Sequence, residues 1–171
     1  RSKLPPQSEE ALQRLSHLTD TLNSVISLKR RIIEDLRPSA LDNLGLVASL
    51  EILVREFGER SGIQVHTNLG AVAPKGAVAL TIYRLVQEAL TNMGKYAKAT
   101  QANVTMVAQG GQLEVVVSDD GAGFDTSTLR VASHGLAGMR HRVEAAGGKL
   151  RVESQLAAGT RISAVIPLPK A

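Results

Sequence analysis

Glycine and proline divide this 171-residue chain into short segments, and their spacing constrains the fold more than any other feature. Proline cannot continue a helix and paired glycines favour turns, so each of these positions ends the segment before it. The segments at 40–60, 77–97 and 135–146 are typical of helices, whereas those at 63–67, 102–108, 113–118, 149–154 and 161–167 are typical of strands. Helices mixed with mostly hairpin-linked strands predict an α+β fold, a two-layer sandwich in which a helical layer covers a mixed sheet.

Two helices separated by Pro38 are predicted before the first strand. The first, over 8–37, carries apolar or small residues in steps of four and three, with Lys29 as the one interruption: Ala11, Leu15, Leu18, Leu22, Val25, Ile32 and Leu36. This heptad seam is typical of a helix that packs lengthwise on a partner, as in a bundle; the alternative is an amphipathic helix that lies on its own domain. The second helix, over 40–60, has a predicted apolar face of Leu44, Val47, Leu50, Ile52, Leu53, Val54 and Phe57.

The composition excludes several classes of protein. The chain has no cysteine, which rules out disulfides and thiolate metal sites. No apolar run reaches the roughly 20 residues of a membrane helix and no signal peptide opens the chain, so we expect a cytoplasmic protein, or the cytoplasmic part of a membrane-anchored one. The net charge of +4 could indicate nucleic-acid binding, but acidic and basic residues are interleaved and aromatic residues make up only 2%, so we expect no nucleic-acid partner.

The segment 87–97 places an acid, an amide and an ammonium group on one helix face. Glu88 and Asn92 are four residues apart and Asn92 and Lys95 are three apart, which aligns their side chains. An amide oxygen is a hard ligand suited to Mg²⁺, and a lysine is a point charge for phosphate. The cluster suits a magnesium nucleotide, although a solvated helix face with ordinary side-chain pairs would show the same pattern.

A hydrophobic strand leads directly into two carboxylates and a Gly-x-Gly turn, Asp119-Asp120-Gly121-Ala122-Gly123-Phe124. Carboxylates at a strand end can accept hydrogen bonds from an exocyclic amine such as the 6-amino group of adenine. The glycines allow the backbone to approach a flat ligand closely. An ordinary Asp-Gly turn is the alternative, and a Ca²⁺ loop is disfavoured because further oxygen ligands at regular spacing are missing.

A second glycine-rich segment opens the last helix, Ser133-His134-Gly135-Leu136-Ala137-Gly138-Met139-Arg140. The unpaired N–H groups and the positive dipole end of such a helix start favour phosphate binding. The segment lacks the Gly-Lys-Ser/Thr end of a Walker A loop, and no βαβ unit surrounds it as in a Rossmann fold. By itself it could also be a plain glycine-rich loop before a helix.

Together, the three clusters resemble the nucleotide-binding boxes of the GHKL ATPase superfamily, which includes gyrase, Hsp90, histidine kinases and MutL. Q-E-A-L-T-N-x-x-K-x-A at 87–97 resembles the N box, D-x-G-x-G-F at 119–124 the G1 box, and G-L-x-G-M-R at 135–140 the G2 box. The joint L-R-P-S-A-L-D-N-L-G-L at 36–46 resembles that of sensor histidine kinases paired with LuxR/NarL-type response regulators. The resemblance implies the GHKL, or Bergerat, ATP-binding fold.

The resemblance also implies ATP and Mg²⁺ as cofactors and a role for individual residues. Asn92 would be the metal ligand, Asp119 would read adenine, Lys95 would lie near phosphate, and Glu88 would order metal-bound water or assist proton transfer. The stretch 125–133 would be the ATP lid. The remaining residues expected around the nucleotide are Tyr96, Gly121, Gly123, Phe124, His134, Gly135, Leu136, Gly138, Met139 and Thr160.

The same resemblance implies a domain organisation and an activity. Residues 1–37 would be the second helix of an incomplete dimerisation and phosphotransfer stalk, and residues 38–171 the ATP-binding catalytic domain. The chain contains no His followed by Asp or Glu, so we expect a piece of a longer homodimeric kinase that transfers the ATP γ-phosphoryl to a histidine elsewhere and thence to a response regulator. The alternatives are a nucleotide-binding regulatory or dimerisation module without kinase activity, and an anti-sigma-factor-like serine kinase.

Overall fold

The computed structural model describes residues 18, 22, 38–71, 74–126 and 134–168. By its internal contacts the chain divides into two units, 1–39 and 40–171. The predicted stalk helix lies outside the described residues, apart from Leu18 and Leu22, which are helical and 58% and 60% exposed. Within the described part of the chain, no helix combines the length and the apolar character needed to cross a membrane.

The described elements follow one another in the predicted order. The helices are α2 (Ser39–Ser61), α3 (Gly76–Asn92) and α4 (His134–Ala145), and a π-helical turn, η1 (Met93–Ala97), extends α3. The strands are β1 (Gln64–Leu69), β2 (Gln101–Gln109), β3 (Gln112–Asp119), β4 (Lys149–Ser154) and β5 (Thr160–Pro167). Apart from η1, which ends at Lys98 in a left-handed conformation, these elements end at or near a glycine, a proline or a polar pair, as the spacing of these residues predicts.

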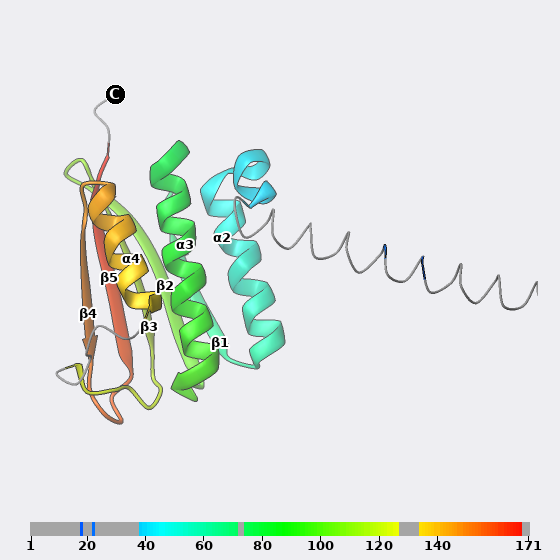
Figure 1. The fold of residues 1–171 in the computed structure, drawn as a ribbon, viewed down its shortest axis with the longest axis vertical. Coiled ribbons are helices and arrows are strands. Elements are labelled where there is room, and N and C mark those ends of the chain that lie inside the picture. The colour runs from blue at the N-terminus through cyan, green and yellow to red at the C-terminus, as the bar shows by residue number, and fades with distance from the viewer. Residues whose placement is uncertain (1–17, 19–21, 23–37, 72–73, 127–133, 169–171) are drawn as a thin grey trace, which may run out of the picture. The chain divides into compact units, whose positions relative to one another are not determined.

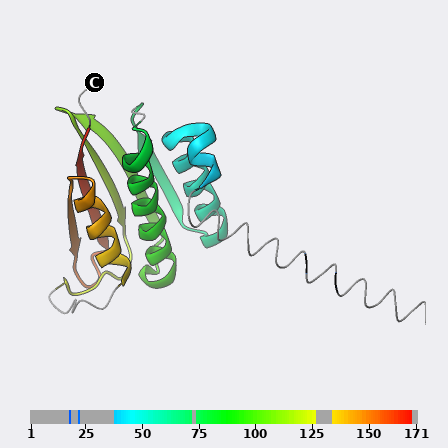
Figure 2. The same ribbon diagram turned by 45° about the horizontal axis from the view of Figure 1, so that its top comes forward.

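The strands form one mixed sheet in the order β1-β2-β3-β5-β4. β1 pairs with β2 in parallel, and the other three pairs of neighbours are antiparallel. Helices α3 and α4 lie along one face of this sheet, with α2 beside α3 (Figures 1 and 2). The two-layer α+β sandwich is therefore confirmed. Because β3 and β5 are central neighbours, Asp119 at the end of β3 lies opposite Thr160 at the start of β5.

The core lies between the sheet and the helical layer. Alternate residues of the central strands point to this layer and are buried: Ala102, Val104, Met106, Leu113, Val115, Val117, Ile162, Ala164 and Ile166. They pack against buried helix residues that include Leu50, Ile82 and Leu90. Full burial of each large apolar side chain stabilises the fold by about 1.5–3 kcal/mol, so this layer fixes the ends of α3 and β3 relative to each other.

Helix α2 departs from the prediction at Gly45, whose φ of 80° and ψ of 177° interrupt the helix. The helical repeat of apolar residues predicted over 40–60 does not continue across this break. Leu44, expected on the apolar face, is 58% exposed, whereas Leu41 and Leu46 are buried. The prediction for Leu44 is therefore wrong, because non-helical dihedrals at the next residue change which side chains face the sheet. The buried Ser49 hydroxyl donates a 2.7 Å hydrogen bond to the Gly45 carbonyl oxygen, so both polar groups are satisfied.

Replacing Gly45 with alanine is expected to lower the free energy of unfolding by about 1–3 kcal/mol, because residues with a side chain rarely adopt this backbone conformation. A Cβ at this position would meet no atom within 4 Å, so the cost is backbone strain and not a clash. Gly58→Ala in the same helix is the matched control, because its Cβ would make an ordinary 3.4 Å contact and alanine favours helix. Urea unfolding measures both variants; wild-type stability in Gly45→Ala would contradict the strained conformation.

Candidate functional site

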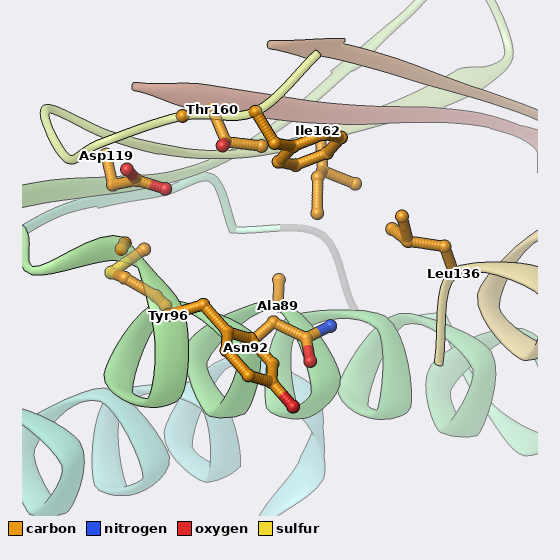
Figure 3. A pocket seen from close by; sticks show the side chains of 11 residues that line it. Ala89, Asn92, Tyr96, Asp119, Leu136, Thr160 and Ile162 are labelled. Carbon is orange, nitrogen blue, oxygen red and sulfur yellow. The ribbon is translucent and has the colours of Figure 1, made fainter. Parts of the chain in front are cut away.

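A cavity of about 260 Å³ lies between helix α3 and the ends of β3 and β5. Figure 3 shows Asp119 and Thr160 on the sheet side of this cavity, facing Ala89 and Asn92 on the helix. Among the residues that the structure describes, the lining consists of Ala89, Asn92, Met93, Tyr96, Ala97, Asp119, Gly123, Phe124, Leu136, Thr160 and Ile162. An apolar lining with a few polar groups is typical of a small-molecule site.

Asp119 presents a half-buried carboxylate to the cavity. Its Oδ1 accepts a 2.9 Å hydrogen bond from the backbone N–H of Gly121. Burial raises the pKa of Asp119 above its ordinary value, and hydrogen bonds from the backbone of Gly121 and Thr160 lower it by a smaller amount. The carboxylate is thus held in place by the loop that follows β3, as a hydrogen-bond acceptor for a ligand.

Asp120 has a different role, because it is exposed and is not part of the cavity lining. Its Oδ1 accepts hydrogen bonds from the backbone N–H groups of Thr100 and Gln101 at 2.8 and 2.9 Å, and its Oδ2 accepts one from the Thr100 hydroxyl at 2.6 Å. These bonds, with that from Gln101 the largest cause, lower the pKa of Asp120. Of the two adjacent carboxylates, one faces the cavity and the other ties the start of β2 to the end of β3.

The opposite pKa shifts of the two aspartates predict opposite contributions to stability against pH. Because the pKa of Asp120 is lower in the folded state than its ordinary 3.8, its ionised form stabilises the fold above that value, and this stability is lost as the pH falls through the folded pKa. In Asp120→Asn, the melting temperature should therefore fall less steeply than in the wild type as the pH is lowered.

The matched control for this prediction is Asp119→Asn. The pKa of Asp119 is raised, so its protonated form contributes stability that is lost as the pH rises through the folded pKa. Removing this carboxylate should change the slope of melting temperature against pH in the opposite sense to Asp120→Asn. Thermal unfolding from about pH 3 to 6 measures both profiles, and profiles parallel to that of the wild type would contradict the assignment.

The end of α3 is locked to the loop after β3. In the turn η1, the Ala97 carbonyl oxygen accepts a 2.6 Å hydrogen bond from the Ala122 N–H, and a Cβ at Gly121 would clash with that same oxygen. Gly94 has a packing role, because a Cβ there would lie 3.2 Å from Cε2 of Phe57 on α2. Gly121 therefore lets the loop approach the end of the helix closely, and Gly94 lets the same helix end pack on α2.

The start of α4 approaches Glu88 and Asn92. The Asn92 amide nitrogen lies 3.4 Å from Glu88 Oε1, to which it donates, and this bond orients the amide. A Cβ at Gly135 would clash with the same Glu88 oxygen and lie 3.5 Å from the Asn92 nitrogen. Gly135 thus lets the glycine-rich start of α4 pack directly on the polar face of α3, which joins the first and third sequence clusters.

The turn between β4 and β5 packs against the loop after β3, and Ser154, the last residue of β4, connects the two. The Phe124 N–H donates to Ser154 Oγ at 2.9 Å, and this hydroxyl donates to the Gly159 carbonyl oxygen at 2.9 Å. Ser154 Oγ also lies 2.9 Å from Thr160 Oγ1. These bonds hold the loop after β3 against the β4–β5 turn.

Sequence reasoning missed Ser154. The inward positions of β4 are Leu150, Val152 and Ser154, so a hydroxyl takes the last inward position of this strand. A polar residue on an otherwise apolar face, next to a strand end that carries predicted site residues, is the signal that could have identified it.

The predicted site residues divide into those that line the cavity and those that do not. The former are Asn92, Tyr96, Asp119, Gly123, Phe124, Leu136 and Thr160, of which Tyr96 is 72% exposed. Those outside the lining are Glu88, Lys95, Gly121, Gly135, Gly138 and Met139; Lys95 is exposed, and Met139 is 1% exposed and packs in the core. The side chain of His134 and most of the predicted lid, residues 127–133, lie outside the described residues. The roles assigned to all these residues stay predictions.

Comparison with known proteins identifies the family of the chain. The family described as histidine kinase-, DNA gyrase B- and HSP90-like ATPase matches residues 77–170. The signal transduction histidine-protein kinase/phosphatase DegS of Brevibacillus brevis is 39% identical over 163 residues, which cover 94% of this chain and 42% of that protein. The sensor histidine kinase ComP of Bacillus subtilis is 32% identical over 167 residues, which cover 95% of this chain and 22% of that protein.

A solved structure has the same fold. The histidine kinase domain of the blue-light activated histidine kinase EL346 of Erythrobacter litoralis superimposes with a TM-score of 0.60 and 27% identity, over 68% of this chain and 59% of that chain. The chain spans less than half the length of DegS and of ComP.

Proposed function

Because the chain belongs to the family of histidine kinase-, DNA gyrase B- and HSP90-like ATPases, we propose that it is the ATP-binding catalytic domain of a sensor histidine kinase. In this proposal it transfers the γ-phosphoryl of ATP to a histidine that lies outside the chain. The observation that carries the proposal is one cavity with an amide, Asn92, on the helix side and a carboxylate, Asp119, on the sheet side (Figure 3).

The sheet side of the cavity suits a purine with an exocyclic amine. Asp119 offers carboxylate oxygens as acceptors, and Thr160 lies opposite it on the neighbouring strand. Ala89 and Ile162 provide apolar surface that can contact the faces of a flat ring. We therefore assign the base to this end of the cavity, with Asp119 accepting from the 6-amino group.

The helix side suits the metal and the phosphates. The Asn92 amide nitrogen donates to Glu88, so the amide oxygen is the group available as a ligand, and an oxygen ligand is what Mg²⁺ prefers. When bound, Mg²⁺ supplies neutralisation of the charge on the phosphate oxygens. Glu88 orients the amide, and the start of α4 at Gly135 brings backbone N–H groups close to this point. In this proposal the exposed Lys95 adds a positive charge beside the phosphates.

We extend the proposal to the partners of the whole protein. The motif at 36–46 favours a response regulator of the LuxR/NarL type as the final phosphoryl acceptor. The exposed Leu18 and Leu22 belong to the heptad seam, which supports a homodimer through stalk helices, with residues 1–37 as the second stalk helix and 38–171 as the catalytic domain.

Phosphoryl transfer to a separate substrate tests the proposed function. The full chain is mixed with ATP labelled at the γ-phosphate, Mg²⁺ and a separate histidine-bearing stalk helix pair. We expect label on the stalk that is lost in acid and survives base, as a phosphohistidine behaves. Acid-stable label would instead indicate a serine kinase, and ATP binding without transfer would indicate a nucleotide-binding module; either result would contradict the proposal.

A further inference from the structure

Three polar groups surround the hydroxyl oxygen of Ser154. The N–H of Phe124, the carbonyl oxygen of Gly159 and the hydroxyl oxygen of Thr160 each lie 2.9 Å from it. Phe124 comes from the loop after β3, Gly159 from the turn before β5 and Thr160 from the start of β5; of these, Phe124 and Thr160 line the cavity. Ser154 itself is not part of the cavity lining.

The number of hydrogens in this cluster fixes the direction of each bond. A serine hydroxyl has one hydrogen to donate and two lone pairs to accept with. The Gly159 carbonyl oxygen can only accept, so it takes the one hydrogen of Ser154. The Phe124 N–H can only donate, so it takes one lone pair. The contact with Thr160 must use the other lone pair, which makes the Thr160 hydroxyl the donor in that bond.

This direction determines what Thr160 offers to a ligand. With its hydrogen directed at Ser154, the Thr160 oxygen can only accept hydrogen bonds from the cavity that it lines. Asp119, its register partner, is also an acceptor. The polar end of the cavity therefore presents two adjacent acceptors and is matched by a donor of two hydrogens, such as an amino group. An oxo group at the same place would bring a third acceptor against them.

We propose that Ser154 is a specificity-determining positioning residue, which holds the Thr160 hydroxyl as an acceptor and so makes the cavity select a 6-amino purine over a 6-oxo purine. The role rests on the proposed function, since it concerns the base of the bound nucleotide. Ser154 acts through Thr160 and does not itself contact the ligand.

The ratio of two binding constants tests this role. Calorimetry with Mg²⁺ gives the Kd of the full chain for ATP and for inosine triphosphate, which carries a 6-oxo group in place of the 6-amino group. In Ser154→Ala, the Thr160 hydroxyl can turn and donate to the oxo group, so we expect the preference for ATP to fall roughly tenfold, the effect of about one hydrogen bond. A purely structural role would weaken both nucleotides equally, and an unchanged ratio would overturn the proposal.

A second substitution separates Ser154 from the rest of the site. Thr160→Val removes the hydroxyl at nearly constant shape, so in this background Ser154→Ala should no longer change the ratio. A change as large as in the wild-type background would also overturn the proposal. If Ser154→Ala does not fold, Ser154→Cys replaces it, because a thiol is a weaker acceptor and should lower the same ratio; an unchanged ratio there has the same meaning.

The result also distinguishes the two proposals. A wild-type chain that binds ATP, with a ratio insensitive to Ser154, would overturn the role of Ser154 and leave the proposed function standing. A wild-type chain that binds neither nucleotide would overturn both.

Discussion

Replacing Asn92 with alanine is expected to lower phosphoryl transfer to a histidine-bearing stalk by about 10²- to 10³-fold, the size of loss seen when one group that stabilises developing charge is removed. Asn92 is placed for this role by two neighbours: its amide nitrogen donates to Glu88, and Gly135 packs against the same pair. Among the described lining residues, Asn92 is the one with an amide side chain, and the variant leaves the apolar walls unchanged. Initial rates with labelled ATP measure the effect.

Thr91→Ala is the matched control for this variant. Thr91 is the preceding residue of the same helix, is exposed, and uses its hydroxyl to donate to the Gln87 carbonyl oxygen at 2.7 Å. Its loss should leave the transfer rate near that of the wild type. Transfer that survives Asn92→Ala at a similar rate would remove Asn92 from the metal site.

Gly123→Ala is expected to weaken ATP binding by roughly 30-fold or more, because it combines backbone strain with a clash. Gly123 has a φ of 57°, which disfavours a side chain. A Cβ there would also clash with the backbone carbonyl oxygen of Gln155 and lie 2.8 Å from that of Gly159. The loop that follows Asp119 would have to move away from the β4–β5 turn, and Gly123 and Phe124, which line the cavity, would move with it.

The matched control separates strain from clash. Gly110 in the β2–β3 turn has a φ of 60°, close to that of Gly123, but a Cβ there would meet no atom within 4 Å. Gly110→Ala should therefore lower the melting temperature and leave the Kd for ATP unchanged. Calorimetry and thermal unfolding of both variants decide the point, and a wild-type Kd in Gly123→Ala would show that the loop is not held against the turn when ATP binds.

The sequence contained enough to predict the order of elements and the mixed sheet. The repeat of apolar residues and the positions of turn residues are local properties, and they determine each helix and strand almost independently of the rest of the chain. The interruption of α2 at Gly45 was not predictable in this way, since an isolated glycine in a helical segment can also simply continue the helix. Leu44 was assigned to the wrong face for that reason.

The site was predicted in its parts but not in its internal bonds. The spacing of Glu88 and Asn92 on one helix face sufficed to identify that pair, because an α-helix fixes which residues are adjacent. The resemblance to the G1 box singled out Asp119, but no local pattern predicts the bonds of Asp120 to Thr100 and Gln101, which follow from the pairing of β2 with β3. The contact of Ser154 with Phe124 joins residues 30 positions apart, so it depends on tertiary structure that no local pattern contains.

A crystal structure of the chain with Mg²⁺ and a non-hydrolysable ATP analogue would test whether one cavity holds both ends of the nucleotide. We predict the 6-amino group within hydrogen-bonding distance of Asp119, and the metal bound by the side-chain oxygen of Asn92, across the cavity from Asp119 (Figure 3). A base bound away from Asp119, or a metal with no contact to Asn92, would contradict this assignment.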